Sequence, residues 1–391
     1  MPPAQPRRFT AAFDAFFESE RSSSVLLVIA TLASLTLANS SLGPAYTAIW
    51  NVDIGGEPLV GWINDGLMAV FFLHIGLELE RELYSGELSN PSQAILPIVA
   101  AIGGMLMPAL LHFAFNAGTP TQSGVGIPMA TDIAFALGAL AMLGQRVPAA
   151  LKVFVVAYAV MDDLGAMLVI AAFYTAKLSF GYLAAAIGAW LVLVVLNRRF
   201  QVQALSPYLV GGTLTWWLLH HSGVHATLAG VALAFAIPYS SRDADSASPS
   251  HRLEAMLHRP VAYGILPVFA LANTGLVLGG EWVQSLASTN SVGILAGLVA
   301  GKPLGVVAAA WLAVKVGLSR LPAELNWRHI IGAGLLGGIG FTMSIFIANL
   351  AFADAPATVT DSKVAVLVAS VVSGLAGYLW LTVTNQRSGA Q

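Results

Sequence analysis

Long apolar stretches, separated by mostly short polar connections, recur along the whole chain. A helix that crosses a membrane needs about 20 mostly apolar residues, and on that rule the sequence contains about twelve candidate spans. Their approximate limits are 23–39, 59–84, 95–116, 124–143, 150–175, 181–197, 205–220, 223–238, 261–279, 291–314, 329–351 and 361–383. The pattern predicts an all-α integral membrane protein in which residues 1–391 form a single polytopic domain. The first apolar run also resembles a signal-peptide core, but the many spans that follow it favour a retained helix.

The composition agrees with a chain surrounded by lipid. Hydrophobic residues make up 57% of it and charged residues only 10%, against roughly 25% charged in a typical soluble domain. The net charge of −2 provides no basic surface for nucleic acid. The absence of cysteine excludes disulfides, thiolate metal sites and thiol catalysis.

The basic residues alternate between the two sides of this topology. If the N-terminus is cytoplasmic, fifteen of the eighteen basic residues fall at cytoplasmic ends of spans, Lys177 and Lys363 fall on the opposite side, and Lys302 lies within a span. The fifteen are Arg7, Arg8, Arg21, Arg81, Arg146, Lys152, Arg198, Arg199, Arg242, Arg252, Arg259, Lys315, Arg320, Arg328 and Arg387. Because cytoplasmic loops carry the excess of Lys and Arg, both termini are predicted to be cytoplasmic.

The first loop on the outer side, residues 49–59, alternates apolar and polar residues around Gly55 and Gly56. This pattern predicts a short β-hairpin. It is either simply an ordered loop or a dimer contact made by strand pairing.

Two spans are interrupted near their centres. The fourth reads G-I-P-M-A-T-D-I-A-F-A-L-G from residue 126, and the eleventh reads G-G-I-G-F-T-M-S-I-F from residue 337. Backbone groups freed in this way are tolerated only inside protein or beside a wet cavity. The second interrupted span comes seven spans after the first, and an odd offset inverts the second unit relative to the first. The pattern therefore predicts an inverted repeat of residues 95–177 and 290–383, of the kind found in secondary transporters. Residues 23–85 and 205–280 would then form the interface helices. Ordinary glycine-mediated helix packing is the simpler alternative.

Few ionisable residues lie deep within the spans: Asp132, the adjacent Asp162 and Asp163, and Lys302, with Asp65 a weaker addition. Each intramembrane carboxylate costs at least ~2.5 kcal/mol, so such residues are expected to face water, an ion or a partner. Adjacent helical residues point about 100° apart. One aspartate can therefore face a cavity while the other faces Lys302.

Asp132 and Lys302 have a second possible role. If the two broken helices cross, a carboxylate near their N-termini and an ammonium near their C-termini would offset the partial charges of the helix ends. Alternatively, Asp132 simply caps its own short helix. In either case the aspartates, helped by oxygen from Thr131 and freed carbonyl groups, can hold a small hard cation or protons. Competition for the same oxygens is sufficient for antiport, and two protons exchanged per sodium ion would move charge.

Five segments carry a resemblance to a known family: A-T-D-I-A-F-A-L-G (130–138), M-D-D-L-G (161–165), S-G-V-H-A-T-L-A-G (222–230), G-K-P-L-G (301–305) and G-I-G-F-T-M-S-I-F-I-A (338–348). They resemble NhaA-type sodium/proton antiporters, and the resemblance runs in order from about residue 10 to 383.

This resemblance implies a secondary transporter, not an enzyme. Such a protein exports Na⁺ or Li⁺ in exchange for periplasmic H⁺, moves net charge, needs no cofactor, and serves pH and sodium homeostasis. It implies a homodimer in the lipid of the bacterial inner membrane. Asp163 would be the primary ligand of the transported Na⁺, and Asp162 would share the site and pair with Lys302. Thr131 and Asp132 would support them.

The family is activated at alkaline pH, and its pH response is attributed to charged groups in a cytoplasmic funnel. The matching positions are Glu78, Arg81, Glu82, Arg252, Glu254 and His258, with His225 on the other face. The simpler explanations are charge pairs on a solvated helix end and a hydrogen-bonded core histidine. Glu80 and His251 stand where lysine is expected, which bears on the activating pH.

Two other classes of protein remain as alternatives. An intramembrane aspartyl protease uses two aspartates on separate helices, as Asp132 and Asp163 could, but its G-x-G-D pattern is absent and Lys302 has no role there. A cation channel is disfavoured by a lysine at the site and by the inverted repeat.

Overall fold

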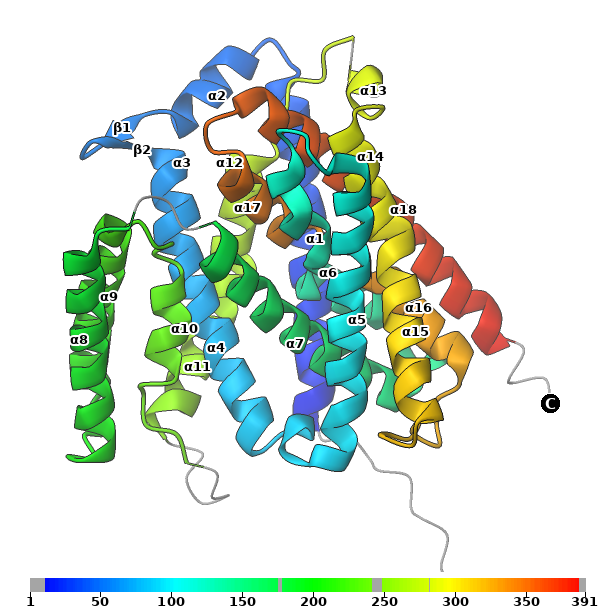
Figure 1. Ribbon diagram of the computed structural model, residues 1–391, viewed down its shortest axis with the longest axis horizontal. Helices are drawn as coiled ribbons and strands as arrows, with labels where there is room; N and C mark the ends of the chain where they lie inside the picture. Colours follow the sequence, from blue (N-terminus) through cyan, green and yellow to red (C-terminus); the bar gives the residue numbers. More distant parts are fainter. Residues whose placement is uncertain (1–10, 175–177, 241–247, 281, 387–391) are drawn as a thin grey trace, which may run out of the picture.

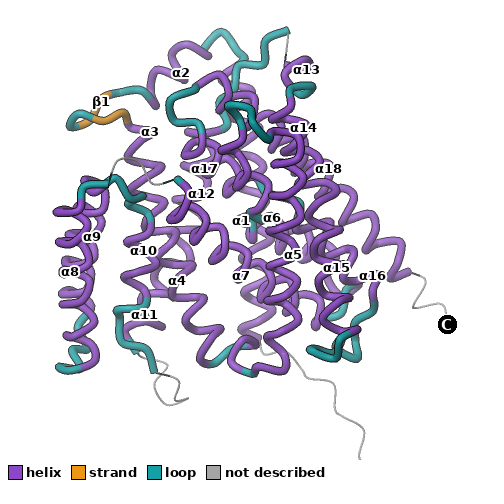
Figure 2. Tube along the Cα trace, viewed as in Figure 1, coloured by secondary structure: helices purple, strands orange, loops and turns teal. Residues whose placement is uncertain are grey.

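The computed structural model describes residues 11–174, 178–240, 248–280 and 282–386 as a bundle of helices that cross between two ends (Figure 1). Among the described residues the helices are α1 (Ala11–Ala38), α2 (Gly43–Trp50), α3 (Leu59–Trp62), α4 (Met68–Tyr84), α5 (Pro91–Asn116), α6 (Ile133–Leu143), α7 (Ala149–Phe173), α8 (Phe180–Arg198), α9 (Leu205–Ser222), α10 (Leu228–Ala234), α11 (Pro249–Pro260), α12 (Leu266–Asn273), α13 (Trp282–Ser285), α14 (Thr289–Leu295), α15 (Lys302–Lys315), α16 (Trp327–Gly337), α17 (Phe341–Ala351) and α18 (Pro356–Gln386). Most loop segments lie at the two ends of the bundle (Figure 2).

Short π-helical segments join three pairs of helices into continuous spans. They are Ile63–Leu67 between α3 and α4, Val261–Ile265 between α11 and α12, and Ala296–Gly301 between α14 and α15. Such segments are rare and often occur at functional sites. The last of them leads directly into Lys302, the first residue of α15.

Within the described part of the chain, nine helices are long and apolar enough to cross a membrane, or ten if α16 and α17 count as one bent span. The protein is therefore a multi-pass membrane protein. Two of the twelve predicted spans do not meet this criterion. The helix α9 is long enough but contains two tryptophans and two histidines, and α10 has only 7 residues, about 10 Å at 1.5 Å per residue. The count of twelve stays a prediction.

The connections sort into two sets, at opposite ends of the bundle. The turns after α4, α8 and α15 lie at the lower end in Figure 1, whereas α2, α13 and the strands lie at the upper end. This arrangement matches the alternation on which the predicted orientation depends. Four of the predicted cytoplasmic residues (Arg7, Arg8, Arg242 and Arg387) and Lys177 lie outside the described residues.

The predicted hairpin is present at the upper end. Strands β1 (Asp53–Ile54) and β2 (Glu57–Pro58) pair antiparallel, with Asp53 opposite Pro58. Gly55 and Gly56 form the turn with φ of 70° and 95°, a region that glycine adopts without steric cost. The hairpin prediction is confirmed, while its role in a dimer stays a prediction.

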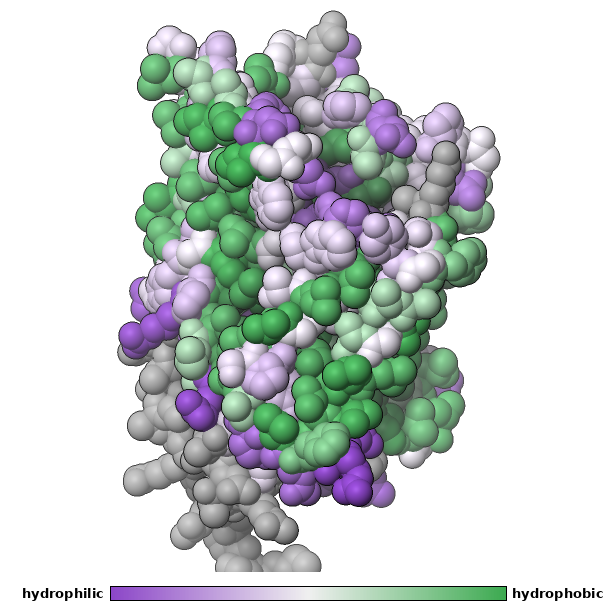
Figure 3. Space-filling model, turned by 90° about the vertical axis from the view of Figure 1, so that its left-hand side faces the viewer, coloured by the Kyte–Doolittle hydropathy of each residue, from purple (hydrophilic) through white to green (hydrophobic). Residues whose placement is uncertain are grey.

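Helix α5 packs closely against α15 in the interior of the bundle. A methyl group on Gly305 would collide with the backbone carbonyl of Gly103 on the facing helix, so glycine at both positions lets the two backbones approach. Apolar side chains also cover much of the surface, as on the face in Figure 3 where α8 and α9 lie. Phe180, Ile187 and Val192 on α8 are exposed, as expected for a helix that faces lipid.

Candidate functional site

The two interrupted spans meet at their breaks. The first consists of a 3₁₀ segment, Gln122–Met129, followed by an extended stretch and then α6. The second bends by 46° between α16 and α17. Across the junction, the Asp132 N–H donates to the Ile339 carbonyl at 2.6 Å, and the Thr131 hydroxyl donates to the Gly337 carbonyl at 2.8 Å. Donors at the first break therefore bond backbone carbonyl groups at the second break, which have no partner within their own helix. Within a membrane such groups must be hydrogen-bonded inside the protein.

The Asp132 carboxylate lies at the N-terminal ends of two helices. It accepts hydrogen bonds from the Phe135 N–H at 3.1 Å, at the start of α6, and from the Thr342 N–H at 3.0 Å, at the start of α17. The Thr342 hydroxyl adds a third bond at 2.5 Å. Asp132 therefore caps its own helix and also lies beside the N-terminus of the crossing helix, so its charge offsets both partial positive charges.

Lys302 is completely buried and forms an ion pair with Asp162, which is also completely buried. Its Nζ lies 2.7 Å and 2.8 Å from the two carboxylate oxygens. It also donates to the carbonyl of Met129, the last residue of the 3₁₀ segment, so the ammonium lies at a negative helix end. The ring of Tyr158 lies 5.8 Å from this cation. A buried charge pair is stable only with such close geometry and further hydrogen bonds.

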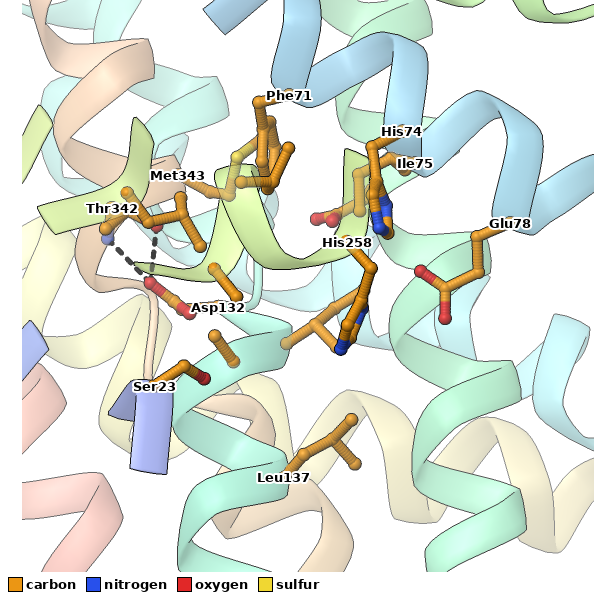
Figure 4. A pocket seen from close by; sticks show the side chains of 16 residues that line it. Ser23, Phe71, His74, Ile75, Glu78, Asp132, Leu137, His258, Thr342 and Met343 are labelled. Atoms are coloured by element: carbon orange, nitrogen blue, oxygen red, sulfur yellow. Dashed lines mark hydrogen bonds between the residues drawn. The ribbon is translucent and has the colours of Figure 1, made fainter. Parts of the chain in front are cut away.

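Asp163, the next residue along α7, has a different environment. Its side chain is 1% exposed, and neither carboxylate oxygen has a hydrogen-bond partner among the described residues. It lines a cavity of about 50 Å³ together with Asp132, Glu78, His74 and His258, and these four residues are labelled in Figure 4. The cavity is large enough for water. Of the adjacent aspartates, only Asp163 presents free oxygens to a space that an ion or a proton carrier can enter.

Thr131 does not line this cavity. Its hydroxyl donates to the Gly337 carbonyl and lies 3.3 Å from the hydroxyl of Tyr158, the residue whose ring lies beside Lys302. In this conformation it supports the ion pair and the crossing.

The predicted pH-responsive residues fall at two places. At the lower end, Arg81 lies 2.7 Å from Glu254, 3.3 Å from Glu82 and 3.7 Å from Glu78. Because Glu78 also lines the cavity, it connects this cluster to Asp163. Arg252 is exposed on α11.

The two residues that depart from the family pattern lie near that cluster. The buried Glu80 accepts a hydrogen bond from the Ser250 hydroxyl at 3.0 Å. The His251 ring lies 2.7 Å from the Ser248 hydroxyl.

His225 lies in the segment between α9 and α10. In Figure 1 this segment connects to the upper end of α9. The Nε2 of His225 lies 2.6 Å from the Tyr174 carbonyl. Asp65 is paired with His220 at 3.4 Å. The structure therefore does not bring His225 or Asp65 to the cavity.

Two residues of the site were missed by the sequence analysis: Tyr158, beside Lys302, and His74, on the cavity wall. Tyr158 lies in an apolar run without any distinguishing signal. His74 has one, because an imidazole within a span is an ionisable group, and such groups are functional by default.

The fold and the site together define a class: a multi-pass membrane protein in which two broken helices cross beside buried charged residues. The chain matches the family model described as Na⁺/H⁺ antiporter 1 over residues 14–381. It is 58% identical over 379 residues to the Na⁺/H⁺ antiporter NhaA of Dechloromonas aromatica, covering 97% of each chain.

Two further relatives are comparably similar. They are NhaA of Cytophaga hutchinsonii (53% identical, 96% of each chain) and NhaA 1 of Flavobacterium johnsoniae (54% identical, 96% of this chain and 97% of the relative). The chain belongs to the Na⁺/H⁺ antiporter 1 family, which confirms the resemblance seen in the motifs.

Proposed function

We propose that this protein exchanges Na⁺ for H⁺ across the membrane and that Asp163 is the group for which the two ions compete. The observation that carries the proposal is the contrast between two adjacent carboxylates. Asp162 is neutralised by Lys302 at 2.7 Å, whereas Asp163 faces a cavity with both oxygens unpartnered among the described residues. A buried carboxylate in that state binds a proton or a hard cation, because an uncompensated charge there is costly.

The exchange follows from exclusive occupancy. When Asp163 holds a proton, its oxygens are poor ligands for Na⁺, and when it holds Na⁺ the proton must leave. If the Asp162–Lys302 pair also changes its protonation in each cycle, two protons move against one Na⁺ and the exchange transfers charge. Asp132 and Thr131 support the site by holding the crossing together.

We further propose that Li⁺ shares the site, that exchange is activated at alkaline pH, and that the cluster around Arg81 contributes to this activation. The proposed setting is the bacterial inner membrane, with both termini cytoplasmic and H⁺ entering from the periplasm. In that orientation the lower end of Figure 1 is cytoplasmic. The proposed homodimer pairs the upper-end hairpin of one copy with that of the other.

Everted membrane vesicles test the exchange directly. Vesicles acidified by respiration should lose part of their pH gradient when Na⁺ or Li⁺ is added, and lose more of it at alkaline than at neutral pH. Vesicles from cells that carry the Asp163→Asn variant in equal amount provide the control. A gradient that responds to Na⁺ at neither neutral nor alkaline pH would contradict the proposal.

A further inference from the structure

A buried imidazole without a partner faces the same cavity as Asp163. His74 on α4 is 7% exposed, and neither of its ring nitrogens has a hydrogen-bond partner among the described residues. Buried polar groups are nearly always hydrogen-bonded, so each exception calls for an explanation. The functions proposed above make no use of this side chain.

His74 is one of two imidazoles on the cavity wall. The ring of His258 on α11 lies 5.7 Å from it between centroids, tilted by 35°, and both rings lie between Glu78 and Asp132 in Figure 4. The cavity of about 50 Å³ has room for more than one water, since a single water needs about 10–15 Å³. Water can therefore link Asp163 to an imidazole nitrogen across the cavity.

The charged and titratable groups around these two rings come from four elements. They are Glu78 and Arg81 on α4, Asp163 on α7, Asp132 before α6, and His258 and Arg259 on α11. Arg81 is already engaged by three carboxylates. The cavity wall therefore carries both carboxylates and imidazoles, and a neutral imidazole nitrogen can accept a proton and pass it on.

We infer that His74 is the proton carrier that takes the proton from Asp163 on the side of the cavity that leads to Glu78 and the Arg81 cluster. The inference deepens the proposed exchange and rests on it. As the cation takes the carboxylate, the O–H bond of Asp163 breaks and an N–H bond forms on His74. The imidazolium then releases its proton through water past His258 and Glu78. The charge of the cation replaces that of the departing proton at Asp163, and no electrons are transferred.

Two substitutions separate proton transfer from cation binding. His74→Gln keeps a polar side chain but removes the group that takes up a proton. His74→Leu places an apolar side chain of similar size in the span. The leucine variant can be measured if the glutamine variant does not fold. In vesicles or proteoliposomes, both should lower the maximal exchange rate by about tenfold or more. The Na⁺ concentration for half-maximal exchange at alkaline pH should change by less than about twofold, because binding to Asp163 is retained.

Chemical rescue distinguishes a proton carrier from a structural residue. Imidazole added to His74→Ala should restore part of the lost rate and should leave His221→Ala, which changes an exposed histidine on α9, unaffected. An unchanged maximal rate and pH profile in the glutamine and leucine variants would overturn the inference. The inference would also be overturned if the variants lost Na⁺ affinity to the same extent as they lost rate and imidazole did not restore the rate. If Asp163→Asn still exchanges ions, the proposed function itself fails; if it is inactive while His74→Gln is normal, only the role of His74 fails.

Discussion

Lys302 lies against both oxygens of the Asp162 carboxylate, at 2.7 Å and 2.8 Å, although the two residues are 140 positions apart and neither is accessible to solvent. This pair connects the start of α15 to the middle of α7, directly beside the crossing of the two broken spans. By fixing the rotation of α7, it also determines that the neighbouring Asp163 faces the cavity.

Asp163→Asn should abolish cation-driven proton movement while the protein remains in the membrane. The amide cannot exchange a proton in this pH range, and it removes the negative charge that attracts the cation. Because the substitution removes an unpartnered buried acid, the melting temperature in detergent should stay the same or rise. Asp65→Asn is the matched control, since Asp65 lies away from the cavity beside His220, and its exchange should be close to normal. Full Na⁺-driven proton release in Asp163→Asn would remove this residue from its proposed role.

The Asp162–Lys302 pair should show strong energetic coupling. Lys302→Met leaves Asp162 buried without its cation, and Asp162→Asn leaves the ammonium unpaired, so each single variant should lose about 3–5 kcal/mol of stability. The double variant should lose less than the sum of the two, because it leaves neither charge alone. Thermal unfolding of all four proteins in one detergent measures the cycle. Additive losses would show that the two charges are not coupled.

Much of this site could be predicted from the sequence, for reasons that residues 126–138 illustrate. A proline and glycines in mid-span free backbone groups, and the threonine and aspartate beside them can bond such groups, so the pattern predicts a break that is buried in protein. Lys302 is the only basic residue at the right depth, which leaves few partners for it. The sequence could not show which aspartate meets the lysine, because adjacent residues on a helix are equivalent until packing sets the rotation of α7.

The segment 223–238 shows a second limit of the sequence pattern. Its apolar composition suggests a full span, but Gly223, at φ 83°, ends α9, and only Leu228–Ala234 is α-helical. Composition reports how apolar a segment is, and not where its backbone leaves the helix. His74 is a different case, because an imidazole within a span was a signal in the sequence, but the sequence does not show which helix face lines a cavity.

Arg81→Gln should shift the pH profile of exchange toward alkaline pH. Arg81 lies within 4 Å of three carboxylates, and loss of its positive charge favours the protonated forms of these groups. If their ionised forms accompany activation, a higher pH is then needed to reach the same rate. Exchange measured between pH 6.5 and 9 in everted vesicles gives the midpoint, and Arg198→Gln, on an exposed residue in the last turn of α8, is the control. A midpoint that is unchanged, or that moves toward acid, would separate this cluster from the pH response.

Thr342→Val should weaken the crossing of the broken spans. It removes the hydroxyl that donates to Asp132 at 2.5 Å but leaves the backbone donor at 3.0 Å in place. The loss of one hydrogen bond to a buried charge should cost about 1–3 kcal/mol. The melting temperature in detergent should fall accordingly, whereas Thr360→Val, on an exposed hydroxyl of α18 that bonds only within its own helix, should change it little. Equal effects of the two substitutions would contradict a special role for the Asp132–Thr342 contact.

The hairpin at the upper end permits a test of the proposed dimer. Gly55 and Gly56 turn the chain with φ of 70° and 95°, and valine at both positions would be strained by about 1–3 kcal/mol per residue. The double variant Gly55→Val/Gly56→Val should therefore lose the hairpin. If strand pairing holds two copies together, this variant should be a monomer. Light scattering in detergent measures its mass. Gly118→Val is the matched control, because Gly118 has φ 75° in another loop with open space around it, and it should remain dimeric. Residues 55 and 56 do not line the cavity, and the hairpin lies at the upper end of the bundle, so the monomer should still exchange Na⁺ for H⁺ in vesicles. A double variant that remains dimeric would place the contact between copies elsewhere on the surface.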